Sequence, residues 1–136
     1  MDKLFVFGTF KQGFPLHEQG IGGAKYLGAY RTVQRYPMFV AGRWFAPMML
    51  NQPGAGLLVK GELYEVDEAR LATIDLLESI GKPGNLRVSV EVERIGGDDT
   101  CSAFAYAKSP ELATPAHTGH LDDYQDRRFI PPSRRD

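Results

Sequence analysis

The sequence lacks the features that define several large classes of protein. It has one cysteine, Cys101, among 136 residues, so no disulfide can form within the chain and a cysteine-based metal site is not favoured. No apolar run is long enough to span a bilayer. The N-terminal stretch is too short and too quickly interrupted for a signal peptide. These absences lead us to expect a cytoplasmic protein that does not bind membranes.

The chain also has no large excess of positive or negative charge. Sixteen Lys and Arg residues balance seventeen Asp and Glu residues, which leaves a formal net charge of −1. No basic field or charged tail is present to attract nucleic acid or an anionic surface, and we expect neither as a partner. What the chain does have is a hydrophobic content of 43% and a length that suits a single domain over residues 1–136 with one core.

Fifteen glycines and nine prolines indicate a chain of many turns, with more strand than helix. Apolar stretches predict strands at 4–7, 24–33, 57–66, 86–95 and 100–107, with shorter pieces at 36–40 and 45–50. The first of these is apolar throughout, as expected of a strand that is buried on both faces. Mostly consecutive strands with one main helix inserted late predict an α+β protein, with a curled sheet or small barrel packed against the helix.

One helix is well defined by its boundaries. Asp67 is a good N-cap, and helix-forming residues follow as far as residue 80, where Gly81 and Pro83 end the helix. From residue 109 the composition shifts to proline, histidine and aspartate. We therefore expect residues 109–136 to be a Pro-rich C-terminal tail packed on the body, with at most one short helix near residues 120–127.

A carboxylate is out of place on this helix. At about 100° per residue, Glu78 falls between Leu71 and Ile74, on the face that turns toward the core. Burial and the negative end of the helix dipole both disfavour the ionised form, so both would raise the pKa of Glu78. Such a group can accept and return a proton near neutral pH. The alternatives are a tilted helix with Glu78 paired to Lys82 in water, or Asp75 in the same role.

A second candidate feature is the stretch FVFGTFKQG at residues 5–13. Gly8 allows a sharp turn after the strand, and amides beyond a strand end have no ladder partner, so they can form a concave anion site. Thr9 adds a hydroxyl, and His17 follows closely enough to line whatever the loop holds. The spacing of a phosphate-binding loop is absent. Taken alone, these residues are more typical of a plain turn.

Three further side chains are weaker candidates. His117 and His120 have helical spacing, but a glycine lies between them and Cys101 is distant in sequence, so a metal site is not favoured. A nucleophilic pair of Cys101 with one of these histidines stays open. Cys101 nevertheless occupies the place of a small apolar residue in a strand.

The stretch LFVFGTFKQGFPLH resembles the signature of the γ-glutamylcyclotransferase-like family, whose first strand ends in Tyr-Gly-Thr-Leu followed by Lys-Arg-Gly. The similarity continues through YPMFVAG at 36–42 and VKGELYEVDEARLATIDLLE at 59–78, which ends where the family has its catalytic glutamate. It covers roughly residues 3–106. The nearest subgroup is that of the γ-glutamylamine cyclotransferases and avirulence-induced-gene-like (AIG2-like) proteins.

This resemblance implies a small, distorted mixed β-barrel with packed helices. It implies that Phe7, Gly8, Thr9 and Phe10 bind the substrate and that Glu78 is the general acid and base. The implied reaction cyclises a γ-glutamyl amine or peptide to 5-oxoproline and releases the amine, with no metal or organic cofactor. The implied partner is that small molecule alone, and we expect a monomer or weak homodimer.

The sequence departs from the family pattern at three places. Phe7 replaces the loop tyrosine, Phe10 replaces the loop leucine, and Asn85 stands near the place where a tyrosine commonly precedes an arginine, for which Arg87 is the counterpart. These departures leave a second hypothesis open. The chain would then be a catalytically impaired module on the same fold that binds a small molecule or a partner without turnover.

Overall fold

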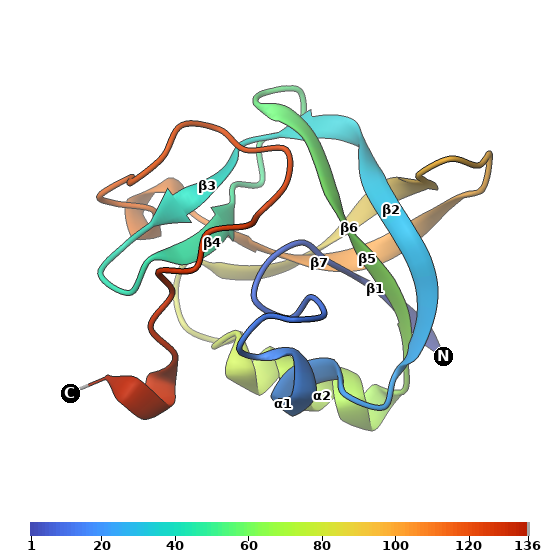
Figure 1. Cartoon of the computed structure of the whole chain (residues 1–136), viewed down its shortest axis with the longest axis horizontal. Coiled ribbons are helices and arrows are strands. Elements are labelled where there is room, and N and C mark those ends of the chain that lie inside the picture. Colours follow the sequence, from blue (N-terminus) through green and yellow to red (C-terminus); the bar gives the residue numbers. More distant parts are fainter. Residues whose placement is uncertain (136) are drawn as a thin grey trace.

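The computed structural model of the chain describes residues 1–135 (Figure 1). Its strands are β1 (Asp2–Val6), β2 (Lys25–Tyr36), β3 (Met38–Ala41), β4 (Ala46–Met49), β5 (Leu57–Val66), β6 (Asn85–Arg94) and β7 (Thr100–Lys108). Its helices are α1 (His17–Ile21) and α2 (Glu68–Leu77), with 3-10 turns at Pro110–Leu112 and Pro132–Arg134. Within the described residues, β1, β5, β2, β6 and β7 close in that order into a barrel, and β3 and β4 form a separate two-stranded sheet.

Pairing in the barrel is mixed. Neighbouring strands are antiparallel except β1 and β7, which are parallel. Figure 1 shows α1 and α2 side by side against one end of the barrel. The expected α+β class and the distorted mixed barrel with packed helices are therefore confirmed, and the strand predicted at 57–66 coincides with β5.

Strand β1 is buried on both faces, as its unbroken apolar run predicts. Phe5 belongs to the cluster that fills the barrel, whereas Leu4 and Val6 belong to a second cluster with Leu71 and Ile74 of α2. Successive side chains of a strand point to opposite faces, so β1 separates the barrel interior from the helices. The loop that follows β1 consequently starts where these two packed regions meet.

Helix α2 begins as predicted and ends early. The Asp67 carboxylate caps it by accepting a hydrogen bond from the Arg70 amide at 2.7 Å. The helix ends at Leu77 rather than at residue 80, and Ser79 adopts a left-handed φ of 56°. Glu78 is therefore the C-cap of the helix and not a residue of its last turn.

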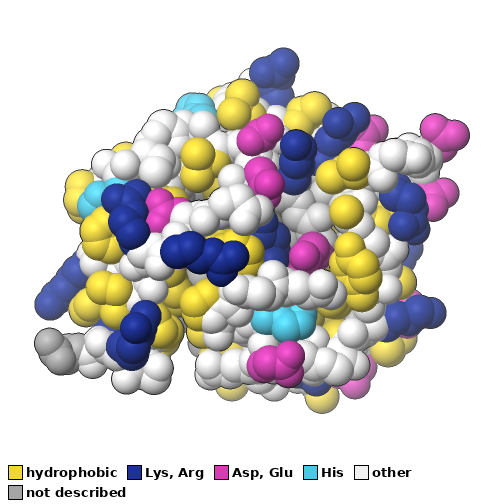
Figure 2. Space-filling model, in the orientation of Figure 1, with side chains coloured by type: hydrophobic (Ala, Val, Ile, Leu, Met, Phe, Trp, Pro, Cys, Tyr) yellow, Lys and Arg dark blue, Asp and Glu magenta, His cyan; other side chains and the backbone are white. Residues whose placement is uncertain are grey.

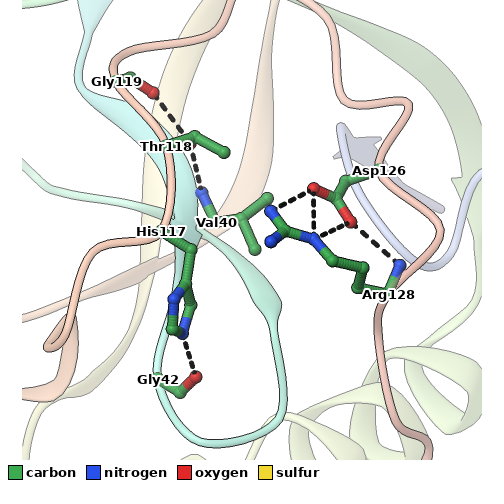
Figure 3. Close-up of polar contacts among 7 residues, drawn as sticks. All are labelled: Val40, Gly42, His117, Thr118, Gly119, Asp126 and Arg128. Carbon is green, nitrogen blue, oxygen red and sulfur yellow. Dashed lines mark hydrogen bonds and ion pairs between the residues drawn. The ribbon is translucent and has the colours of Figure 1, made fainter.

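The segment after β7 runs back along the small sheet (Figure 1). The amides of His117 and Leu121 donate to the carbonyl oxygens of Val40 and Met38, at 2.8 and 2.7 Å. Figure 3 shows the His117 ring beside the β3–β4 turn, where its Nε2 lies 2.8 Å from the Gly42 carbonyl oxygen. This segment thus behaves as an added extended chain along β3.

Two short segments carry no clear helical signal in the sequence. Residues 120–127, where at most one short helix was expected, contain none; their backbone has partners in strands, and the Asp122 carbonyl oxygen, for example, accepts a hydrogen bond from the Lys60 amide at 2.7 Å. Helix α1 was not predicted at all. It has five residues and no side-chain cap, so neither periodicity nor a boundary signal marks it.

The surface agrees with the balanced composition. Figure 2 shows acidic and basic side chains together on the same face, without a field of one sign. Across residues 1–135, no helix has the length and apolar character needed to cross a membrane.

Candidate active site

A pocket opens where the loop after β1 meets β4 and the end of α2. The loop contributes Phe7, Gly8, Thr9 and Phe10, and the remaining lining residues are Phe5, Val6, Pro47, Met48, Met49, Glu78, Tyr106 and Lys108. The pocket is open to solvent, and the empty space within it and at its mouth amounts to about 400 Å³. The structure therefore brings together the two features that the sequence singled out, the glycine loop and Glu78.

Gly8 allows the loop to lie against β4. A Cβ atom at this position would be 2.5 Å from Cγ of Pro47, so the close approach requires glycine. No backbone carbonyl among residues 1–135 accepts a hydrogen bond from the amides of Thr9 or Phe10. These amides match the expectation of unpaired donors after the strand end, and they suit an anion or a developing oxyanion.

Glu78 lies on the pocket with its side chain 22% exposed. Its ionic partner is Lys108, whose Nζ is 3.5 Å from Oε2, and not Lys82 as the alternative interpretation held. Burial raises the pKa of Glu78 above its usual value, and the charge and hydrogen bond of Lys108 offset this only in part. A carboxyl group with a raised pKa is suited to take up and return a proton.

Asp75, the alternative carboxylate, is not among the lining residues. Its Oδ1 accepts a hydrogen bond from the Tyr106 hydroxyl and its Oδ2 accepts one from Arg87, both at 2.7 Å. Burial raises the pKa of Tyr106, and the hydrogen bond to Asp75 adds to this. Asp75 therefore accepts a hydrogen bond from the neutral Tyr106 phenol at the wall of the pocket, and its own charge is balanced by the ion pair with Arg87.

Sequence reasoning missed Tyr106 and Lys108. Both come from β7, two positions apart and so on one face of the strand. A tyrosine and a lysine on the face that otherwise packs toward the helices are the signal that would have found them. Nothing local in the sequence indicates that this strand end lies beside Glu78.

His17 does not line the pocket. It begins α1, and its Nδ1 lies 2.9 Å from the carbonyl oxygen of Phe10. Its ring packs 6.0 Å from that of Tyr64. These contacts support a role in holding the backbone of the loop, and a direct contact of His17 with substrate stays a prediction.

The three weaker candidates, Cys101, His117 and His120, pack against other side chains and do not line the pocket. Cys101 packs at the edge of the barrel cluster, His117 stacks on Phe45 with ring centroids 4.3 Å apart, and His120 lies 6.0 Å from Phe39. Within residues 1–135, no cluster of three or more His, Cys, Asp or Glu side chains is arranged to hold a metal ion.

Comparison with known proteins identifies the family of this chain. A family model described as "Gamma-glutamyl cyclotransferase, AIG2-like" matches residues 4–126. The chain is 36% identical to the gamma-glutamylaminecyclotransferase of Bos taurus over 129 residues, which are 91% of this chain and 76% of that protein. It is 34% identical to the Homo sapiens protein of the same name over 137 residues, covering 91% and 90% of the two chains.

Solved structures extend the comparison. The crystal structure of an AIG2-like protein from Mus musculus matches with a TM-score of 0.85 and 30% identity, over 99% of both chains. A gamma-glutamyl cyclotransferase shares the fold alone, with a TM-score of 0.65 at 13% identity, over 79% of this chain and 66% of that chain. The barrel carries the loop and Glu78 on one pocket. Because the family model also matches most of its length, the chain belongs to the gamma-glutamyl cyclotransferase, AIG2-like family.

Proposed function

We propose that this protein is a γ-glutamylamine cyclotransferase, which converts the γ-glutamyl group of a γ-glutamyl amine or peptide into 5-oxoproline and releases the amine. One observation carries the proposal. Glu78, a partly buried carboxyl group with a raised pKa, lines the same pocket as Thr9 and Phe10, whose amides donate to no backbone carbonyl among residues 1–135. The pocket thus offers a proton carrier and an oxyanion site together.

The reaction follows from these two groups. Glu78 takes a proton from the α-ammonium of the substrate, and the freed amine attacks the γ-carbonyl carbon to form the new C–N bond of a five-membered ring. The amides of Thr9 and Phe10 stabilise the oxyanion that develops on the carbonyl oxygen. Because nucleophile and electrophile belong to one molecule, holding it folded supplies much of the acceleration.

Glu78 also serves the departure of the amine. Protonated in the first step, it delivers its proton to the amide nitrogen as the old C–N bond breaks. The ring nitrogen loses a second proton, which reaches the leaving nitrogen by the same route, so the amine departs as an ammonium ion. Protons and electrons balance without any further reactant.

Two of the three departures from the family pattern, Phe10 and Phe7, are accommodated by the fold. The Phe10 ring packs toward α1, where a Cβ atom on Gly20 would lie 2.4 Å from it. The bulk of Phe10 is therefore accommodated by a glycine in the neighbouring helix. Phe7 is buried in the barrel cluster, so its ring needs no polar partner. Both facts favour the enzyme over the impaired binding module.

The experiment is a turnover assay. The protein is incubated with γ-glutamyl amines of different chain length and with γ-glutamyl dipeptides, and 5-oxoproline is measured by mass spectrometry. We expect product with at least one γ-glutamyl amine, and a loss of about 10²–10⁴-fold in kcat for Glu78→Gln. Glu111→Gln, a change at an exposed carboxylate, is the matched control and should retain full activity.

Two outcomes would contradict the proposal. A folded protein that binds 5-oxoproline in calorimetry but turns over no substrate of the panel would favour the binding module. Undiminished turnover in Glu78→Gln would remove Glu78 from the mechanism. The monomeric or weakly dimeric state and the cytoplasmic location stay predictions.

A further inference from the structure

A cation lies beside the proposed acid and base. Lys108 is at the end of β7, and its Nζ is 3.5 Å from Glu78 Oε2 and 2.6 Å from Asn85 Oδ1. Its side chain is only 19% exposed. The ammonium is therefore held by two protein acceptors.

Asn85 is well placed to hold this ammonium. Asn85 and Lys108 are directly opposite each other in the β6–β7 pairing, so their side chains are adjacent because of the strand register. An amide oxygen accepts a hydrogen bond without carrying charge. The positive charge of Lys108 is consequently left to act on Glu78 and is not neutralised by its second partner.

The other charged and titratable groups near Glu78 are already paired. Tyr106 and Asp75 are hydrogen-bonded to each other, and Arg87 forms an ion pair with Asp75. The loop and β4 bring no titratable side chain to the pocket. Lys108 is therefore the cation among residues 1–135 that forms an ion pair with Glu78.

We propose that Lys108, held by Asn85, is a positioning residue for the reaction: it binds Oε2 of Glu78, leaves Oε1 to the substrate, and favours the charged carboxylate over the neutral acid. This inference rests on the proposed function, in which Glu78 must act first as a base. Burial alone would favour the protonated form, which cannot accept the ammonium proton. Lys108 opposes that effect and so favours the form of Glu78 that can accept the proton.

The test is a titration of Glu78 that requires no turnover. The carboxyl carbons of glutamate are labelled with ¹³C, and Glu78 is followed by NMR over pH in the wild type and in Lys108→Met. An opposite charge at this distance lowers a carboxyl pKa by roughly one to three units, so we expect the measured pKa of Glu78 to rise by about one pH unit or more in Lys108→Met. Lys108→Arg should restore it.

Two further variants sharpen the test. Asn85→Ala removes only the anchor and should raise the pKa of Glu78 less than Lys108→Met does, which keeps the inference testable if Lys108→Met fails to fold. Lys82→Met removes an exposed lysine that lies close to Glu78 in the sequence. It is the matched control and should leave the titration unchanged.

Kinetics connect the titration to the reaction. With a γ-glutamyl amine as substrate, the acidic limb of the kcat/KM profile of Lys108→Met should move to higher pH by the same amount as the NMR titration. At a fixed pH on that limb, kcat/KM then falls about tenfold for each pH unit of the shift. An unchanged Glu78 pKa in Lys108→Met, or an acidic limb that does not follow the NMR shift, would overturn the inference. Absence of product together with a shifted Glu78 titration would instead overturn the proposed function.

Discussion

Glu78 meets two demands that oppose each other. A proton carrier for neutral pH needs partial burial, and the same burial penalises its ionised form. The pKa of Glu78 is raised in the folded protein, so the folded state binds more protons than the unfolded state between the unfolded and the folded pKa values. Stability therefore decreases as pH rises through that interval.

This linkage predicts that Glu78→Gln is more stable than the wild type, and that the difference in unfolding free energy grows as pH rises. The variant cannot ionise at this position, so its gain in unfolding free energy over the wild type should be smallest near pH 4, below the unfolded value of 4.5, and should grow toward pH 8. Thermal unfolding of both proteins at several pH values measures the difference. A variant that is destabilised more at pH 8 than at pH 4 would show that the ionised carboxylate is stabilising instead.

At the scale of elements, the pocket depends on the β3–β4 hairpin being held at its turn. Phe45 in that turn has a left-handed φ of 55°, an unfavourable conformation for a bulky residue. The His117 ring stacks on the Phe45 ring, and the Arg128 guanidinium lies 4.9 Å from the Phe45 ring centroid. Figure 3 shows Arg128 oriented in turn by Asp126. The segment after β7 thus supports the hairpin whose β4 lines the pocket.

The contact of the loop with β4 predicts the effect of Gly8→Ala. The new Cβ atom would meet the Pro47 ring at 2.5 Å, so the loop and the hairpin must move apart. Overpacking of this kind costs about 1–3 kcal/mol, and displacement of the loop amides should lower kcat/KM by roughly 10–100-fold. Urea unfolding and the turnover assay measure the two effects.

Pro47→Ala provides the control for this prediction. If the contact between residues 8 and 47 is the cause, then the double variant Gly8→Ala/Pro47→Ala should be more active and more stable than the sum of the single changes predicts. Strictly additive losses would place the effect of Gly8→Ala elsewhere.

At the scale of the whole molecule, the C-terminal segment closes the structure over the loop. Lys11 is 5% exposed, and its Nζ donates to the Tyr124 carbonyl oxygen at 2.8 Å and to Asp123 at 3.1 Å. Arg127 donates to the Gly13 carbonyl oxygen at 2.7 Å. One end of the chain therefore holds the loop that follows the first strand.

Substitutions of Tyr124 test how much the C-terminal segment contributes to stability. The side chain is fully buried in the barrel cluster, and its hydroxyl has no hydrogen-bond partner among the described residues. Tyr124→Ala should cost about 3–5 kcal/mol of unfolding free energy, in line with other large aromatic truncations in cores. Tyr124→Phe keeps the ring and removes an unsatisfied polar atom, so its free energy of unfolding should equal or exceed that of the wild type.

Urea unfolding of the two variants separates packing from polarity. A loss of more than about 1 kcal/mol in Tyr124→Phe would show that the hydroxyl contributes a hydrogen bond to the fold. A loss in Tyr124→Ala as small as that of an exposed site would show that the C-terminal segment is not part of the cooperative core.

Local patterns in the sequence determined the elements and two sides of the pocket. The apolar run of β1, the cap at Asp67 and the wheel position of Glu78 each depend on neighbouring residues, since periods of about 2 and 3.6 residues indicate which side chains face the core. The glycine loop was a candidate because a strand end leaves its amides free, but its residues alone are more typical of a plain turn, and the family resemblance implied its binding role. These features required no knowledge of distant parts of the chain.

Only the tertiary structure decided which distant residues meet Glu78 and the loop. Tyr106 and Lys108 reach the pocket through the parallel pairing of β1 with β7 and the register of β6 with β7. The extended path of residues 120–127 depends on carbonyls and amides of β3 and β5. Strand partners come from far along the chain, so the contacts that complete this site are properties of topology that no local period encodes.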